Sequence, residues 1–81
     1  MNVVNKEFES LILLKDLADQ REQLQAILEK YQVEDPEQIK TLIRAEEVPE
    51  HPAYEDYLST LAFQNAIAEM KPLAKQLIED L

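Results

Sequence analysis

The chain has 81 residues, of which 17 are acidic and eight are basic, so its formal net charge is −9. It contains no cysteine, which excludes disulfides, thiolate metal sites and cysteine nucleophiles. It also contains no glycine, which excludes the loops that cradle phosphate groups and dinucleotides. The negative charge repels phosphate backbones and anionic lipid surfaces, so we expect no direct binding to nucleic acid or to a membrane. No stretch approaches the roughly 18 apolar residues of a membrane span, and a cytoplasmic protein is expected.

Residues 5–32 are predicted to form a long helix. They contain no proline and are rich in leucine, glutamate, glutamine, lysine and alanine, which all favour helices. Asn5 is the expected N-cap. The apolar side chains recur mostly at steps of three, four or seven residues, so they form a stripe on one side. The apolar run at 11–14 covers all sides of one turn, and we expect more than one neighbour to bury it.

A short helix is predicted over residues 36–46. Asp35 is the expected N-cap, Pro36 occupies the first position, where its missing N–H costs nothing, and Gln38 completes a capping box. Pro49 prevents the helix from extending far, because the residue before a proline is pushed out of helical geometry. The helix has one apolar face and is expected to cover the hairpin formed by the two long helices.

A second long helix is predicted over residues 52–70, with Pro52 near its start. Its apolar residues follow steps of three and four almost to the C-terminus. Pro72 lacks the N–H that would bond to the carbonyl of Ala68, so it produces either a kink or a break that opens a final helix ending near residue 80. We expect a bend at Met70–Lys71.

These elements predict an all-α protein with a single helical domain over residues 1–81. The fold is a helical hairpin of two long helices with a short connecting helix. A chain this short has a marginal core of its own, and an isolated hairpin would be long and thin. We therefore expect two hairpins to pair as a homodimer, forming an antiparallel bundle of four-helix type.

The joint between the short helix and the last helix concentrates acids and tyrosines. Residues 34–56 contribute −6 of the net charge of −9. Two interpretations remain open: the joint is a surface that binds another protein, or it is a solvated linker whose prolines end one helix and start the next. The candidate partner-binding residues are Glu46, Glu47, Glu50, His51, Tyr54 and Tyr57.

The joint is not expected to hold a metal. Metal sites in helical bundles use a Glu-x-x-His pair on an unbroken helix, whereas Val48 stands three residues before His51 and Pro49 interrupts the helix between them. No serine has the glycine-flanked turn that activates a nucleophile. We expect no catalytic residue, no cofactor and no enzymatic activity.

The predicted function is that of a small acidic protein acting through protein–protein interaction, as an adaptor, a regulator or an accessory subunit. Its expected partners are a second copy of itself and an unidentified protein, which can have a basic surface. The alternative is an acidic inhibitor, similar to an antitoxin, that mimics nucleic acid and blocks a basic groove on its partner. Salt distinguishes the two, because mimicry weakens steeply with ionic strength and an aromatic contact does not.

Overall fold

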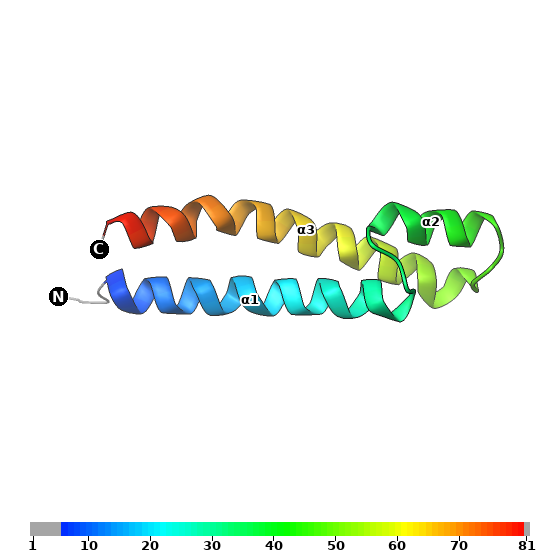
Figure 1. Ribbon diagram of the computed structural model, residues 1–81, viewed down its shortest axis with the longest axis horizontal. Coiled ribbons are helices and arrows are strands. Elements are labelled where there is room, and N and C mark those ends of the chain that lie inside the picture. The colour runs from blue at the N-terminus through cyan, green and yellow to red at the C-terminus, as the bar shows by residue number, and fades with distance from the viewer. Residues whose placement is uncertain (1–5, 81) are drawn as a thin grey trace.

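The computed structural model describes residues 6–80, which form three α-helices and no β-strand (Figure 1). The helices are α1 (Lys6–Lys30), α2 (Pro36–Arg44) and α3 (Glu50–Glu79). The all-α prediction is thus confirmed, with two long helices that pack against each other. Asn5, the expected N-cap of the first helix, lies outside the described residues.

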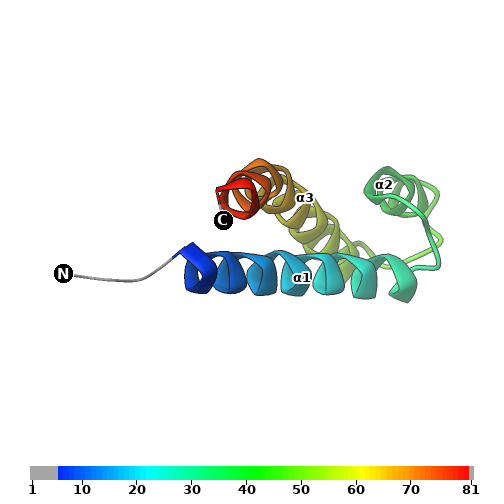
Figure 2. The ribbon, with the colours of Figure 1, turned by 60° about the vertical axis from the view of Figure 1, so that its left-hand side comes forward.

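The molecule is a rod built on an antiparallel pair of helices, α1 and α3 (Figure 1). It measures 56 × 19 × 15 Å, and its radius of gyration is 16.5 Å, against about 12 Å for a compact domain of this length. α2 packs against α3 near the end where the chain turns back (Figures 1 and 2). We call this end, residues 21–65, the closed half. The open half consists of residues 7–20 of α1, residues 66–79 of α3 and the C-cap residue Asp80.

The two long helices meet along one seam that runs through both halves. Its α1 residues from Ser10 to Ile27 are spaced alternately by three and four positions, the heptad pattern that keeps one side of a helix facing its partner. Gln20 is a half-buried polar member of the seam, and its neighbour Arg21 is exposed. The buried and half-buried positions are Ser10, Leu13, Leu17, Gln20, Leu24, Ile27 and Leu28 of α1, followed by Tyr31 just after the helix.

The hydrophobic core lies in the closed half, where α2 joins the pair. Leu28 of α1, Ile39 of α2 and Tyr57 of α3 form its centre, and the Ile39 side chain is 0% exposed. The half-buried residues that pack around this centre come from the same half of the molecule. They are Leu24, Ile27, Tyr31, Val33, Ile43 and Leu61.

The predicted capping box at the start of α2 is confirmed. The Gln38 amide nitrogen donates to Asp35 Oδ1 at 3.2 Å, and the Asp35 amide nitrogen donates to Gln38 Oε1 at 3.2 Å. Pro36 occupies the first helical position, and α2 ends at Arg44. The local sequence therefore places α2 at a defined point of the chain, from which Ile39 reaches the core.

α1 and α2 end in the same way, without the glycine that such ends favour. Gln32 and Glu46 each have a positive φ, of 55° and 58°. The following amides reach back across the last turn: Val33 N–H donates to the Leu28 carbonyl, and Glu47 N–H donates to the Leu42 carbonyl, both at 3.0 Å. These are Schellman motifs, in which a residue with a Cβ atom costs roughly 1–2 kcal/mol in the left-handed region.

α3 has its one departure from helical geometry near its start. His51 has φ −112° and ψ 128°, so the regular helix begins at Pro52 and continues through Pro72 to Glu79. The last helix is therefore not broken at Pro72. Its continuity keeps the C-terminal part of α3 beside the N-terminal part of α1 (Figure 1).

Candidate protein-interaction surfaces

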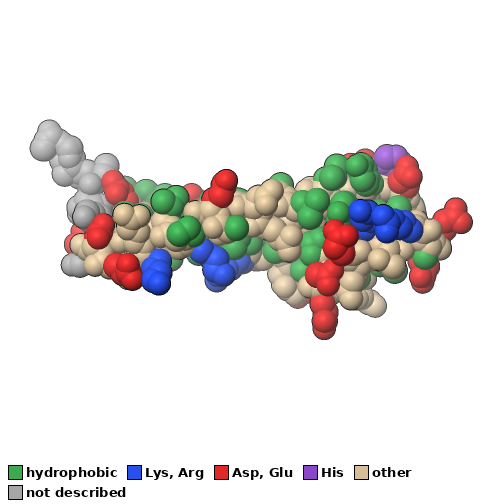
Figure 3. Space-filling model, turned by 90° about the horizontal axis from the view of Figure 1, so that it is seen from above, with side chains coloured by type: hydrophobic (Ala, Val, Ile, Leu, Met, Phe, Trp, Pro, Cys, Tyr) green, Lys and Arg blue, Asp and Glu red, His purple; other side chains and the backbone are tan. Residues whose placement is uncertain are grey.

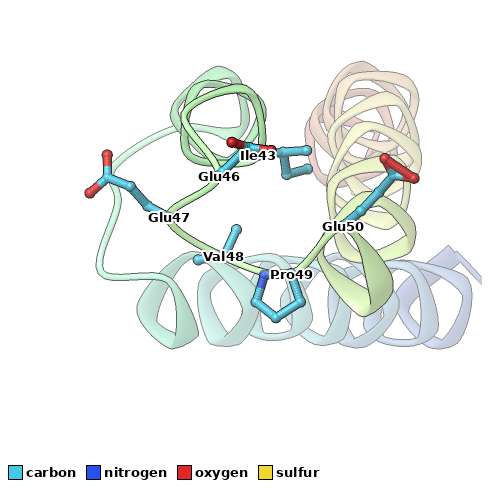
Figure 4. A pocket seen from close by; sticks show the side chains of 6 residues that line it. All are labelled: Ile43, Glu46, Glu47, Val48, Pro49 and Glu50. Atoms are coloured by element: carbon cyan, nitrogen blue, oxygen red, sulfur yellow. The ribbon is translucent and has the colours of Figure 1, made fainter.

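The loop between α2 and α3 borders a hollow of about 460 Å³ (Figure 4). Three of the candidate residues, Glu46, Glu47 and Glu50, line it. The side chains of Glu47 and Glu50 point away from each other at opposite sides of the hollow (Figure 4). Their carboxylates thus do not converge on one point. Among residues 6–80, no group of three or more His, Asp or Glu side chains is arranged to hold a metal ion.

His51 interacts with the acids that flank it. Its Nδ1 lies 2.9 Å from Glu55 Oε2, and its Nε2 lies 3.7 Å from Glu50 Oε2. The hydrogen bond with Glu55 raises the pKa of His51, and the same bond lowers the pKa of Glu55. The imidazole is exposed, so its role in this geometry is to balance charge at the first turn of α3.

The two neighbouring tyrosines have different environments. Tyr57 is 8% exposed, and its hydroxyl donates to Glu37 Oε2 at 2.9 Å. That hydrogen bond raises the pKa of Tyr57. Tyr54 is 48% exposed, with its ring centroid 6.5 Å from that of Tyr57. Of the pair that the sequence suggested, Tyr57 belongs to the core and Tyr54 is accessible to a partner.

A second hollow, of about 300 Å³, lies where α2 faces the start of α3. Lys40, Ile43 and Arg44 of α2 line it together with Glu50 and Tyr54 of α3. The two basic residues were not among the predicted site residues, although their spacing of four on a short helix places them on one side. They bring positive charge beside Tyr54, so the surface of the joint is not uniformly acidic.

A polar cluster joins the end of α1 to α3. Asp56 Oδ2 accepts hydrogen bonds from Lys30 Nζ at 2.8 Å and from the Tyr31 hydroxyl at 2.6 Å. Partial burial favours a raised pKa for Asp56, but the two hydrogen bonds and the Lys30 charge outweigh it and lower the pKa. Sequence reasoning missed this cluster, because its members lie 25 and 26 residues apart.

The open half has an exposed apolar surface, which includes the run at 11–14 that the sequence predicts to need more than one neighbour. Leu11 is 64% exposed, Leu73 is 53% exposed, and four further large apolar side chains in this half are at least 39% exposed. The run at 11–14 therefore has only Leu13 half-buried within the chain. On the face seen in Figure 3, hydrophobic side chains form scattered spots along the open half, and a larger group lies toward the closed half. We call this surface the open-half patch; it consists of Phe8, Leu11, Ile12, Leu14, Leu73 and Ile78.

The fold and these surfaces define an all-α helical hairpin with one covered and one uncovered half. None of the helices in the described part of the chain is both long and apolar enough to cross a membrane. The model of the Uncharacterized protein MJ0235 family matches residues 2–80, and the chain belongs to that family. No curated protein and no solved structure matches the chain.

Proposed function

We propose that this protein is a small, acidic, non-enzymatic interaction protein, acting as an adaptor, regulator or accessory subunit in the cytoplasm. In this proposal the open-half patch binds a second copy of the chain, and the closed half binds another protein. The observation that carries the proposal is the exposure of six large apolar side chains in the half that α2 leaves uncovered.

The size of the open-half patch fits an interface between proteins. With roughly 150–200 Å² for each side chain at full exposure, the six residues present on the order of 500 Å² of apolar surface. A stable interface buries about 800 Å² on each partner, of which a little over half is apolar. These side chains lie on more than one side of the hairpin, so a partner that covers all six would bury about the apolar area that one side of such an interface needs.

The directions of the apolar side chains favour a partner that brings two helices. Successive residues of an α-helix point about 100° apart, so Leu11, Ile12 and Leu14 lie on different sides of α1. One added helix cannot contact all three. A second hairpin brings two packed helices with matching apolar residues, and in a symmetric dimer the same residues of both copies are covered together.

The closed half offers the other proposed contact. Tyr54 is half-exposed and lines a hollow together with Ile43, and Glu50 of the joint lines the same hollow. An aromatic side chain with an apolar neighbour and a polar rim is the usual composition of a binding spot between proteins. Lys40 and Arg44 interrupt the acidic surface here, so we favour this mode over mimicry of nucleic acid.

The test is the mass of the protein in solution, measured by light scattering during gel filtration over a concentration series. We expect a dimer for the natural chain and a folded monomer for Leu11→Glu, because Leu11 is 64% exposed within one copy and a buried unpaired charge opposes association. Leu58→Glu is the matched control: Leu58 is 45% exposed in the closed half, and this variant stays dimeric.

The choice of Leu11 separates association from folding. Leu13 is half-buried against its own chain, so a charge there would disturb the hairpin as well. Circular dichroism of Leu11→Glu should match the helical signal of the natural chain. A natural chain that stays monomeric at every concentration, or a Leu11→Glu variant that remains dimeric, contradicts the proposed self-association.

A further inference from the structure

We infer that the two copies associate antiparallel through their open halves, with the two closed halves at opposite ends of a longer rod. This inference rests on the proposed self-association and adds its orientation and its consequence. The consequence is that the dimer displays two Tyr54 surfaces, one at each end, and so binds a partner protein at two separated points.

The helices are unevenly distributed along the rod. α2 packs against the start of α3 and extends past the end of α1, whereas the open half consists of α1 and α3 alone (Figure 1). Overlapping two open halves creates a four-helix layer in the middle, with an end that carries α2 on each side of it. α2 occupies the closed half of each copy, so it lies outside the overlap.

The charge is also unevenly distributed along the rod. Residues 34–56 carry a net charge of −6, while residues 1–33 and 57–81 carry −2 and −1. The strongly acidic segment contains α2 and the first turns of α3, at one end of the rod. A parallel dimer would place two such ends side by side, where like charges repel. The antiparallel overlap separates them by many times the Debye length of about 8 Å at physiological salt.

The antiparallel arrangement has a measurable length. Each copy is 56 Å long, and an overlap of about 14 residues at 1.5 Å each spans roughly 21 Å. The dimer should therefore be on the order of 90 Å long. Two equal binding surfaces on one rigid rod raise the avidity for a partner that is itself dimeric or repeated, provided that its sites have a matching spacing.

The absence of native cysteine allows orientation to be measured with single spin labels. We would label Glu47→Cys in the joint and, in a separate protein, Ala18→Cys on the exposed side of α1, and measure the distance between the two labels of each dimer by pulsed electron paramagnetic resonance. The inference predicts a distance beyond about 60 Å for the Glu47 pair and below about 35 Å for the Ala18 pair, from the helical rise and this overlap.

Each outcome has a defined meaning. A dimer with a Glu47 pair closer than about 35 Å is parallel and overturns the inference, while the proposed self-association stands. A dimer with a distant Ala18 pair does not overlap through the open halves, and this also overturns the inference. Adding Leu11→Glu to the labelled proteins should abolish both dipolar signals. Light scattering of the same samples identifies the separate case in which no dimer forms and the proposed self-association itself fails.

Discussion

The closed and open halves share the same two helices and the same seam, yet the three-helix core cluster lies in the closed half, and the buried apolar residues of the open half are Leu17 and Ala74. In the closed half, Ile39 comes from α2 and is completely buried against residues of α1 and α3. In the open half no third helix covers the pair, and six large apolar side chains are exposed. A heptad seam is thus sufficient to pair two helices, but side chains just outside the seam need a further element to be buried.

The largest expected effect comes from removing the residue that completes the closed half. Ile39→Ala should lower the free energy of unfolding by about 2–5 kcal/mol, because it leaves a cavity at a fully buried position. Leu73→Ala, an equally apolar residue that is 53% exposed, should have a much smaller effect on the fold. Urea denaturation followed by circular dichroism measures both, at one fixed protein concentration because dimerisation adds to stability.

If Ile39→Ala does not fold, Ile39→Val keeps the comparison testable. Ile39→Val should lower the free energy of unfolding by about 0.5–1.5 kcal/mol. If the substitutions at Ile39 and Leu73 lowered the free energy of unfolding equally, the two halves would not differ in packing within one chain.

The second effect concerns the start of α2, on which the closed half depends. Asp35→Ala removes the acceptor for the Gln38 amide and should cost about 1 kcal/mol of stability. Asp35→Asn keeps an acceptor oxygen and should restore most of that loss. Asp19→Ala, on the exposed side of α1, controls for the removal of one negative charge. Thermal or urea unfolding of the three variants provides the measurement, and equal stability of Asp35→Ala and the natural chain would contradict the capping role.

A smaller effect of opposite sign is expected at the end of α1. Gln32 has φ 55°, so Gln32→Gly relieves the clash of its Cβ atom and should stabilise the protein by about 0.5–1 kcal/mol. Gln23→Gly, at an exposed position inside α1, should instead cost about 1 kcal/mol, because glycine is a poor helix former. Destabilisation of similar size by both substitutions would show that the backbone at Gln32 does not need the left-handed conformation.

The smallest effect is the pH response of the joint. The pKa of His51 is raised, so its contribution to stability is present below the unfolded value of about 6.5 and is lost as the pH rises through the folded pKa. Nuclear magnetic resonance titration of the His51 ring should give a pKa above that unfolded value. Glu55→Gln should lower the pKa of His51 most of the way back to its unfolded value, since the hydrogen bond with Glu55 is the main cause of the rise. Glu50→Gln should lower the pKa of His51 by less. A larger effect of Glu50→Gln than of Glu55→Gln would mean that Glu50 is the main cause of the raised pKa of His51.

The candidate site was only partly predictable, and the tyrosines show why. Both follow Pro52 by a few residues and share a sequence environment, so the local pattern gave them one role. Tyr57 lies on the seam, where its ring joins Leu28 and Ile39 in the core, whereas Tyr54 lies outside the seam. Which tyrosine a partner can reach depends on where α2 packs, and this is a contact between residues about 20 positions apart.

By itself the sequence determined the helical class, the capping box at Asp35, the start of the regular last helix at Pro52 and the concentration of acid at one joint. These features depend on backbone preferences and on hydrogen bonds within a few residues, which a local pattern encodes. Only the tertiary structure decided that Tyr57 is buried, that Asp56 joins Lys30 and Tyr31, and that the apolar residues of the open half are exposed. Such outcomes follow from the packing of distant segments, because a side chain is buried only where another element approaches it.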